Sequence, residues 1–236
     1  MEYNIAGRAD EAVVAAGVQD YMTKVYGWMT AGLGVTAGVS YLVLTSPAVL
    51  EVIFANSFVF MLLFIGQLLL VGAVSGWAQR METGVAAAIF LLYSALNGIT
   101  FSAVFLAYAA DSIINVFVTS ALAFAALSLF GLTTKRDLSG WGSFLFIGLI
   151  GVMLAFVVEM FLGTGALGFA ATVIGVIVFA GLTAYDSNRI KEQYLEIAGT
   201  DAAFMTGRFA VRGALTLYLD FVNLFLLLLR LFGDRR

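Results

Sequence analysis

Long apolar runs alternate with short polar connections along this chain. Because the bilayer cannot satisfy exposed backbone N–H and C=O groups, an apolar run of about 20 residues is expected to form a membrane-spanning α-helix. Seven runs reach that length, at residues 24–45, 57–79, 84–109, 113–132, 141–162, 167–190 and 211–232. The pattern therefore predicts an all-α integral membrane protein, a bundle of seven transmembrane helices.

The remaining stretches are polar or short. Residues 1–23 form a polar N-terminal tail that could run as an interfacial helix into the first span, and residues 24–236 form the membrane domain. Pro47, the only proline, is expected to end the first helix and permit a turn before a short amphipathic piece at 48–55. Glycines three or four residues apart predict close helix packing. These pairs are Gly34 with Gly38, Gly72 with Gly76, and Gly148 with Gly151.

Composition supports the membrane assignment and excludes several kinds of chemistry. Hydrophobic residues make up 62% of the 236 positions and charged residues only 11%, against about 25% in a soluble domain. Cysteine and histidine are absent, which excludes disulfides, Cys or His metal sites and any Ser-His or Cys-His dyad. We therefore expect neither an enzyme nor a bound cofactor. The net charge of −3 contains no basic patch for nucleic acid.

Lysine and arginine in the connections predict the orientation. Basic residues follow the second, fourth and sixth spans, whereas the connections after the first, third and fifth contain none. By the positive-inside rule, the N-terminus lies in the cytoplasm. A seventh span would carry Arg230, Arg235 and Arg236 outside, against that rule. Either six preceding spans force this basic end across, or the seventh segment enters the membrane and returns.

Two aspartates lie inside the predicted spans. Asp220 has eight or more mostly apolar residues on either side, and a charge at that depth costs about 2.5–3.5 kcal/mol. Asn223 lies on the same helical face as Asp220. Asp186 lies one turn inside the cytoplasmic end of the sixth span, three residues before Arg189. The alternatives to a functional role are an interfacial Asp186–Arg189 pair and a hydrogen-bonded packing role for Asp220.

Helix geometry allows the two carboxyl groups to meet. Asp186 lies about 4–5 Å from Arg189 along its helix, and Asp220 about 9–12 Å along the last helix from its start, so their depths differ by only a few ångströms. Two buried carboxyls in contact cannot both ionise cheaply and would share a proton. The protonated pair forms a hydrogen-bonded lock, whereas the deprotonated pair repels itself and offers oxygen ligands to a hard cation such as Ca²⁺.

Four other charged residues could assist the aspartate pair or could be ordinary surface residues. Arg80, at the cytoplasmic end of the second span, could neutralise the ionised pair or act only as a positive-inside anchor. Glu51, Asp111 and Glu159 lie near the three outer connections without a basic residue among them. These three acids could concentrate cations at an outer mouth, or be solvated loop residues.

Two motif matches carry no function. Residues 163–168 read Gly-Thr-Gly-Ala-Leu-Gly, which fits the dinucleotide-binding pattern but follows a transmembrane helix rather than a strand. Tyr185-Asp186 is typical of one half of a paired-aspartate intramembrane protease. Asp220, however, follows Leu217-Tyr218-Leu219 rather than the Gly-x-Gly run of that family, and a Pro-Ala-Leu element is missing.

The segments around both aspartates resemble the Bax inhibitor-1 (transmembrane Bax-inhibitor-motif) family. The residues that carry this resemblance are Gly181-Leu182-Thr183-Ala184-Tyr185-Asp186 and the run from Gly213 to Phe225. Further matching stretches are 25–30, 93–96 and 133–140, so that the resemblance extends from about residue 18 to the C-terminus. It is greatest to the bacterial inner-membrane branch of the family.

This resemblance implies a seven-helix bundle with the last helix at its centre and a pH-sensitive Ca²⁺ leak governed by Asp186 and Asp220, with Arg80 as the latch. We therefore expect a pH-gated cation leak channel or exchanger in the bacterial inner membrane. Ca²⁺ and H⁺ would be its transported or regulatory ions. The alternative is an interaction protein that modulates a membrane quality-control protease, a role described for the bacterial branch, with the 1–23 tail as a contact.

Overall fold

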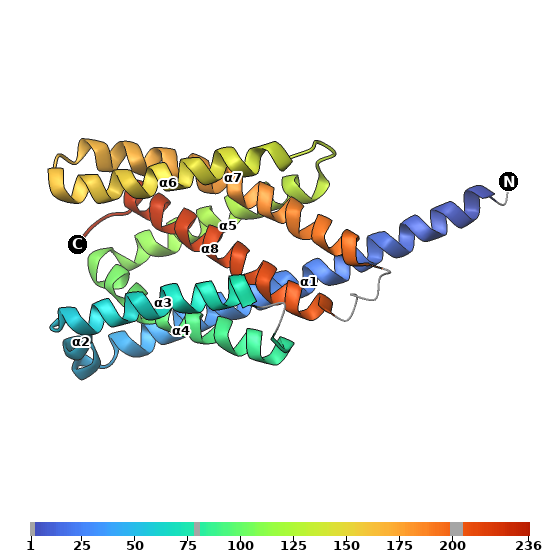
Figure 1. Ribbon diagram of the computed structural model, residues 1–236. Helices are drawn as coiled ribbons and strands as arrows, with labels where there is room; N and C mark the ends of the chain where they lie inside the picture. Colours follow the sequence, from blue (N-terminus) through green and yellow to red (C-terminus); the bar gives the residue numbers. More distant parts are fainter. Residues whose placement is uncertain (1–2, 78–80, 199–204) are drawn as a thin grey trace. The chain divides into compact units, whose positions relative to one another are not determined.

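The computed structural model describes residues 3–77, 81–198 and 205–236, and these residues are helical almost throughout (Figure 1). Pro47 occupies the first turn of the short helix α2, where its missing N–H has no helical acceptor to lose. No strand occurs among the described residues. The helices are α1 (Tyr3–Leu44), α2 (Pro47–Phe54), α3 (Ser57–Trp77), α4 (Thr83–Ala107), α5 (Ala110–Thr133), α6 (Ser139–Leu162), α7 (Ala166–Ile197) and α8 (Thr206–Phe232).

Six described helices are long and apolar enough to cross a membrane, namely α1, α4, α5, α6, α7 and α8. The predicted span 57–79 coincides with α3, but the apolar stretch described there, Met61–Val74, is shorter than a full crossing. The all-helical membrane fold is therefore confirmed, and the count of seven spans stays a prediction.

Helices α1 and α7 extend beyond the predicted spans. α1 is continuous from Tyr3, so the polar tail runs as a helix directly into the first span. α7 ends at Ile197 rather than at 190. The rings of Tyr21 and Tyr194 stack with centroids 4.9 Å apart, which joins the extension of α1 to that of α7.

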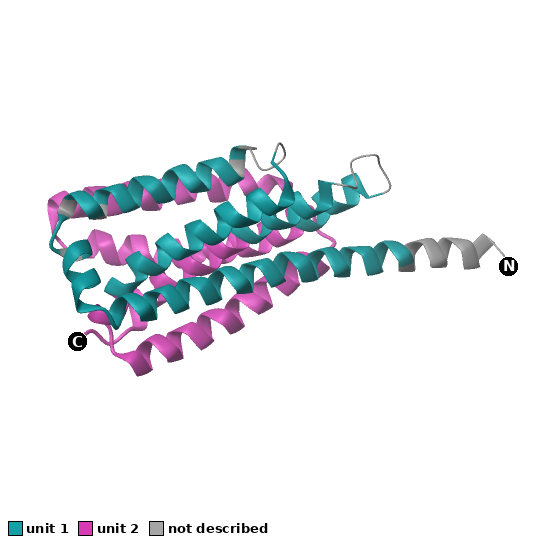
Figure 2. Ribbon diagram, turned by 90° about the horizontal axis from the view of Figure 1, so that it is seen from below, with its two compact units in different colours: residues 1–103, 190–215 teal, residues 104–189, 216–236 magenta. Residues whose placement is uncertain are grey.

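The helices form two compact units (Figure 2). Unit 1 comprises residues 1–103 and 190–215, and unit 2 comprises residues 104–189 and 216–236. Each unit therefore combines segments far apart in the sequence, and α8 contributes its first part to unit 1 and its second part to unit 2.

Small polar residues join α1 to α4 within unit 1. The Thr36 hydroxyl donates to the carbonyl oxygen of Ser94 at 3.0 Å, and the Ser40 hydroxyl donates to that of Gly98 at 2.7 Å. A Cβ atom at Gly98 would lie 2.6 Å from the Thr36 carbonyl oxygen. These helices therefore approach each other backbone to backbone, as small residues allow in lipid.

Most of the glycines predicted to mark close packing do not do so. A Cβ atom built on Gly148 would lie 3.0 Å from Val178, which agrees with the prediction. At the other predicted positions an added Cβ atom would have no neighbouring atom within 4 Å, so these glycines face open space. These positions are Gly34, Gly38, Gly72, Gly76 and Gly151.

Within unit 2, the second part of α8 contacts all three other helices. Phe221 packs edge-on against Phe117 and Phe124 of α5, with ring centroids 5.4 and 5.5 Å apart. Leu224 and Leu227 pack with Phe179 of α7, and Leu149 and Phe156 of α6 lie against this cluster. The most apolar stretch of α8 is 56% buried, against 11–39% for the other five candidate spans. The exposed share of this stretch is accordingly the smallest of the six.

The C-terminal residues bind to the connection between α4 and α5. The Ala109 N–H donates to the Asp234 carbonyl at 3.0 Å, and the Arg236 N–H donates to the Ala107 carbonyl at 3.0 Å. The Asp234 N–H donates to the Ser112 hydroxyl at 2.9 Å. At the other end of α8, Gly207 lies against Thr83, the first residue of α4. α8 itself is one continuous helix from Thr206 to Phe232 and is one of the six candidate spans.

Candidate functional site

Asp186 and Asp220 come together within unit 2. α7 carries Asp186 in its second half, and because α7 continues to Ile197, Asp186 lies further from the helix end than predicted. α8 carries Asp220 near its middle. The two carboxyl groups are close enough to hydrogen-bond to each other. The two side chains therefore lie near each other, and their action as a functional pair stays a prediction.

The two carboxyl groups have different surroundings. Asp220 is 5% exposed, and its Oδ2 atom is buried without a hydrogen-bond partner among the described residues. Asp186 is half-buried, and the guanidinium of Arg189 is close enough to attract it. A buried oxygen without a donor is costly when charged.

A close crossing of α5 and α7 supports Asp186. Gly131 lies so near α7 that a Cβ atom there would overlap the carbonyl oxygen of Ala184. The Asn188 side-chain amide donates to the Gly131 carbonyl at 3.0 Å, and the hydroxyls of Ser128 and Ser187 lie 2.7 Å apart. The sequence reasoning missed this crossing. The available signal was the set of small or polar residues on the two helices, namely Ser128 and Gly131 of α5 and Ser187 and Asn188 of α7.

The remaining predicted site residues divide into three cases. Arg189 lies beside Asp186, as expected. Asn223 is half-buried, and its amide donates to the Leu219 carbonyl of its own helix at 2.8 Å rather than to the aspartates. Arg80 lies outside the described residues.

The outer acids do not form a cation site together. Among the described residues, no group of three or more acidic side chains is close enough to hold a metal ion. Glu51 is exposed on α2, and Asp111 is exposed in the first turn of α5. Glu159 has local partners instead of a shared acidic surface.

Glu159 holds the turn between α6 and α7. Its carboxylate accepts hydrogen bonds from the Thr164 hydroxyl at 2.9 Å and from the Gly165 N–H. Gly163 and Gly165 have φ values of 62° and 73°, a conformation that favours glycine. Residues 163–165 therefore form the turn that ends α6, and residues 166–168 begin α7, which agrees with rejecting the dinucleotide motif.

Arg230 has two favourable contacts at the end of α8. Its guanidinium lies 4.8 Å from the centre of the Phe156 ring and close enough to Glu159 for their charges to attract. The carboxylate of Glu159 and the ring of Phe156 thus stabilise the positive charge of Arg230. Arg230 is one of the basic residues that disagree with the positive-inside rule.

Chemically, the aspartate pair is suited to proton exchange and to weak cation contact. Ca²⁺ takes 6–8 oxygen ligands, and two carboxyls supply only part of that set. An ion passing this pair would keep water or backbone oxygens as its other ligands.

Comparisons with known proteins match nearly the whole chain. A family model described as "Inhibitor of apoptosis-promoting Bax1" matches residues 18–236. Inner membrane protein YbhL of Escherichia coli strain K12 is 50% identical over 221 residues, which cover 94% of each chain. A protein of Borreliella burgdorferi is 40% identical over 216 residues, 92% of each chain. An uncharacterised membrane protein of Streptococcus pyogenes is 39% identical over 219 residues, 92% of this chain and 93% of its own.

Proposed function

The chain belongs to the Bax inhibitor-1 family of multi-pass membrane proteins, and from this membership we propose that it is a pH-gated cation leak pathway of the inner membrane. Asp186 and Asp220 form the gate and share the proton that closes it. Ca²⁺ is the proposed ion, passing through a channel or in exchange for protons.

The observation that carries this proposal is the contact between two carboxyls on consecutive helices. A pair held together only for packing would have its oxygens satisfied, because buried polar groups are normally hydrogen-bonded. The unpartnered Oδ2 of Asp220 instead leaves a site for a proton or a cation. Asp186, being half-buried, provides the route from this oxygen toward water.

The direction of gating follows from charge. With one proton between them, the carboxyls attract each other and hold α7 against α8. Without it, two negative charges in a poorly hydrated site repel each other. Flux is therefore expected to rise with pH, and Arg80 is the proposed counter-charge of the open state.

Reconstitution into liposomes loaded with a Ca²⁺-sensitive dye tests the proposal. Wild-type protein should give a Ca²⁺ flux that increases as the pH rises through the range in which the shared proton leaves. Asp186→Asn should weaken this pH dependence, because asparagine cannot release a proton. The proposal is contradicted if the wild-type flux equals that of empty liposomes or does not vary with pH. A flux that falls with rising pH contradicts the assignment of the protonated pair as the closed state.

We also propose that all seven segments cross the membrane, with α8 at the centre and the N-terminus in the cytoplasm. Because the chain lacks cysteine, single-cysteine variants report sidedness directly. Arg236→Cys should react with a membrane-impermeant maleimide added outside intact cells, as should Asp111→Cys. Lys135→Cys should react only after the membrane is permeabilised. Labelling of Arg236→Cys only in permeabilised cells would place the C-terminus in the cytoplasm and reject the seventh crossing.

The polar end of α1 favours a second function, binding to another membrane protein such as a quality-control protease. The apolar side chain of Val13, in this part of α1, is 71% exposed and therefore accessible to a partner protein. Deleting residues 1–12 should release a co-purifying partner and leave Ca²⁺ flux intact. If the same proteins co-purify with and without these residues, this role is excluded.

A further inference from the structure

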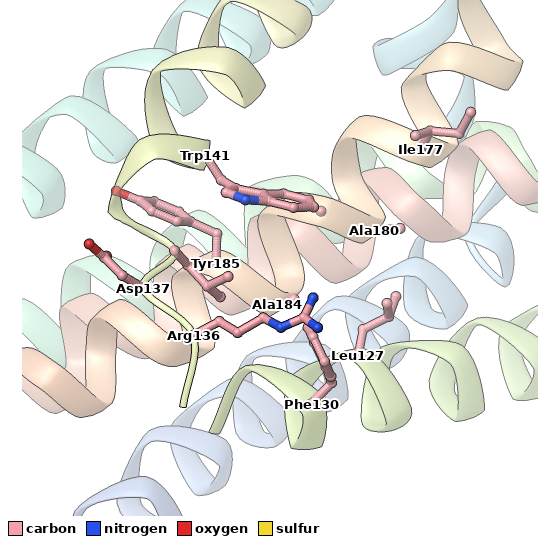
Figure 3. Close-up of a pocket in the computed structure, with 11 residues that line it drawn as sticks. Leu127, Phe130, Arg136, Asp137, Trp141, Ile177, Ala180, Ala184 and Tyr185 are labelled. Atoms are coloured by element: carbon pink, nitrogen blue, oxygen red, sulfur yellow. The ribbon is translucent and has the colours of Figure 1, made fainter. Parts of the chain in front are cut away.

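A lateral groove opens in unit 2 beside the connection between α5 and α6 (Figure 3). Its volume is about 380 Å³. The end of α5, residues 136–138, the start of α6 and one face of α7 form its walls. Ala180 and Ala184 are the small residues of α7 that make it hollow.

Arg136 supplies an unneutralised positive charge to this groove. In Figure 3 its guanidinium extends between Trp141 on one side and Phe130 on the other. Among the described residues, none forms an ion pair with it. Neighbouring Asp137 is engaged elsewhere, since its Oδ1 accepts a hydrogen bond from the Ser139 N–H at 2.8 Å. That bond holds the pKa of Asp137 below its usual range, and its carboxylate points away from the guanidinium.

The rest of the groove is apolar, and its α5, α6 and α7 residues belong to candidate membrane spans. Leu127, Phe130 and Ile177 line it, and Ile177 is 67% exposed. Trp141, 56% exposed, lies just after the start of α6, at the membrane boundary where tryptophan is enriched. From Tyr185 to Ile177 the lining follows α7 for about 12 Å. One end of the groove is therefore positively charged at the interface, and the other reaches into the hydrocarbon.

We propose that this groove binds an anionic phospholipid. The phosphate pairs with Arg136 beside Trp141, and one acyl chain lies along α7 against Ala180 and Ile177. A soluble anion would use the arginine but leave the apolar walls exposed. A neutral lipid would fill the walls but leave the arginine without an opposite net charge. An anionic lipid satisfies both, because an arginine is well suited to bind phosphate.

Quenching of Trp141 by lipids with brominated acyl chains tests the proposal. The Trp28→Phe/Trp77→Phe protein, checked to melt like the wild type, is placed in phosphatidylcholine vesicles. At equal mole fraction, brominated phosphatidylglycerol should quench Trp141 more strongly than brominated phosphatidylcholine. Unlabelled phosphatidylglycerol should reverse the quenching, and inorganic phosphate should not. Equal quenching by both lipids, or displacement by phosphate, would overturn the proposal.

Three variants separate a built site from general surface attraction. Arg136→Gln should lower the preference for phosphatidylglycerol by roughly fivefold or more, which is what one basic residue near the surface contributes. Lys135→Gln makes the same charge change in the same connection without lining the groove, and should have a smaller effect. Ala180→Phe should remove the quenching by filling the acyl position. Equal losses in Arg136→Gln and Lys135→Gln, or full quenching in Ala180→Phe, would reject the site. None of these measurements depends on ion flux.

Discussion

Asp220→Asn is expected to abolish the pH-dependent part of the cation flux. Asparagine has nearly the size of aspartate but cannot release a proton, so the contact with Asp186 is fixed in its hydrogen-bonded form at every pH. The expected loss is about tenfold or more, equivalent to at least about 1.4 kcal/mol in the barrier. The effect exceeds that of Asp186→Asn because Asp220 is the more deeply buried acid.

The measurement is the liposome flux across pH, with Asp20→Asn as the matched control. Asp20 is an exposed partner of Lys24 at the polar end of α1 and should leave the profile unchanged. The double variant Asp186→Asn/Asp220→Asn should be no more impaired than Asp220→Asn alone, because groups that act as a unit are not additive. A normal pH profile in Asp220→Asn would refute the gate. Asp220→Asn should also melt no lower than the wild type, which separates loss of gating from loss of folding.

Gly131→Ala is expected to destabilise the protein by about 1–3 kcal/mol, because the added methyl group overlaps the Ala184 carbonyl oxygen and neither helix backbone can move cheaply. Separating α5 from α7 would also break the bond from Asn188 to the Gly131 carbonyl, two residues from Asp186. The pH profile of the flux should therefore change together with the melting temperature.

Gly151→Ala is the matched control, since it makes the same change in α6 of the same unit with no atom within 4 Å of the new carbon. It should be neutral or slightly stabilising, because alanine is favoured over glycine in helices. Thermal unfolding in detergent, followed by tryptophan fluorescence, compares the two variants. Equal melting temperatures would show that the α5–α7 crossing is looser than the structure indicates.

Helix positions were predictable from the sequence because the bilayer imposes a length and an apolar composition on each crossing. The predicted span 141–162 agrees with α6 to within two residues at its start. Rise per residue placed Asp186 and Asp220 at similar depths, and their role as a pair stays a prediction. The polar ends of α1 and α7 were harder to place, because a helix can continue into water where hydropathy no longer marks it.

Rotation of each helix about its axis was not predictable. These helices are apolar nearly all round, so the pattern does not say which face meets a neighbour. The close contact therefore occurs at Gly131, whereas Gly34 and Gly38 face open space. For the same reason Glu159 was predicted at an outer mouth, although its partners are the backbone of the next turn and Arg230.

The composition of unit 1 has a consequence for biosynthesis. Its first 103 residues leave the ribosome before the 104–189 segment of unit 2, yet they pack with residues 190–215. At about 5–20 residues per second, synthesis of the intervening segment takes about 4–17 s. During that interval the helices within the first 103 residues have only one another and lipid as partners. The hydrogen bonds from Thr36 and Ser40 of α1 to backbone carbonyls of α4 can form during this interval. They hold the two helices together until residues 190–215 are synthesised.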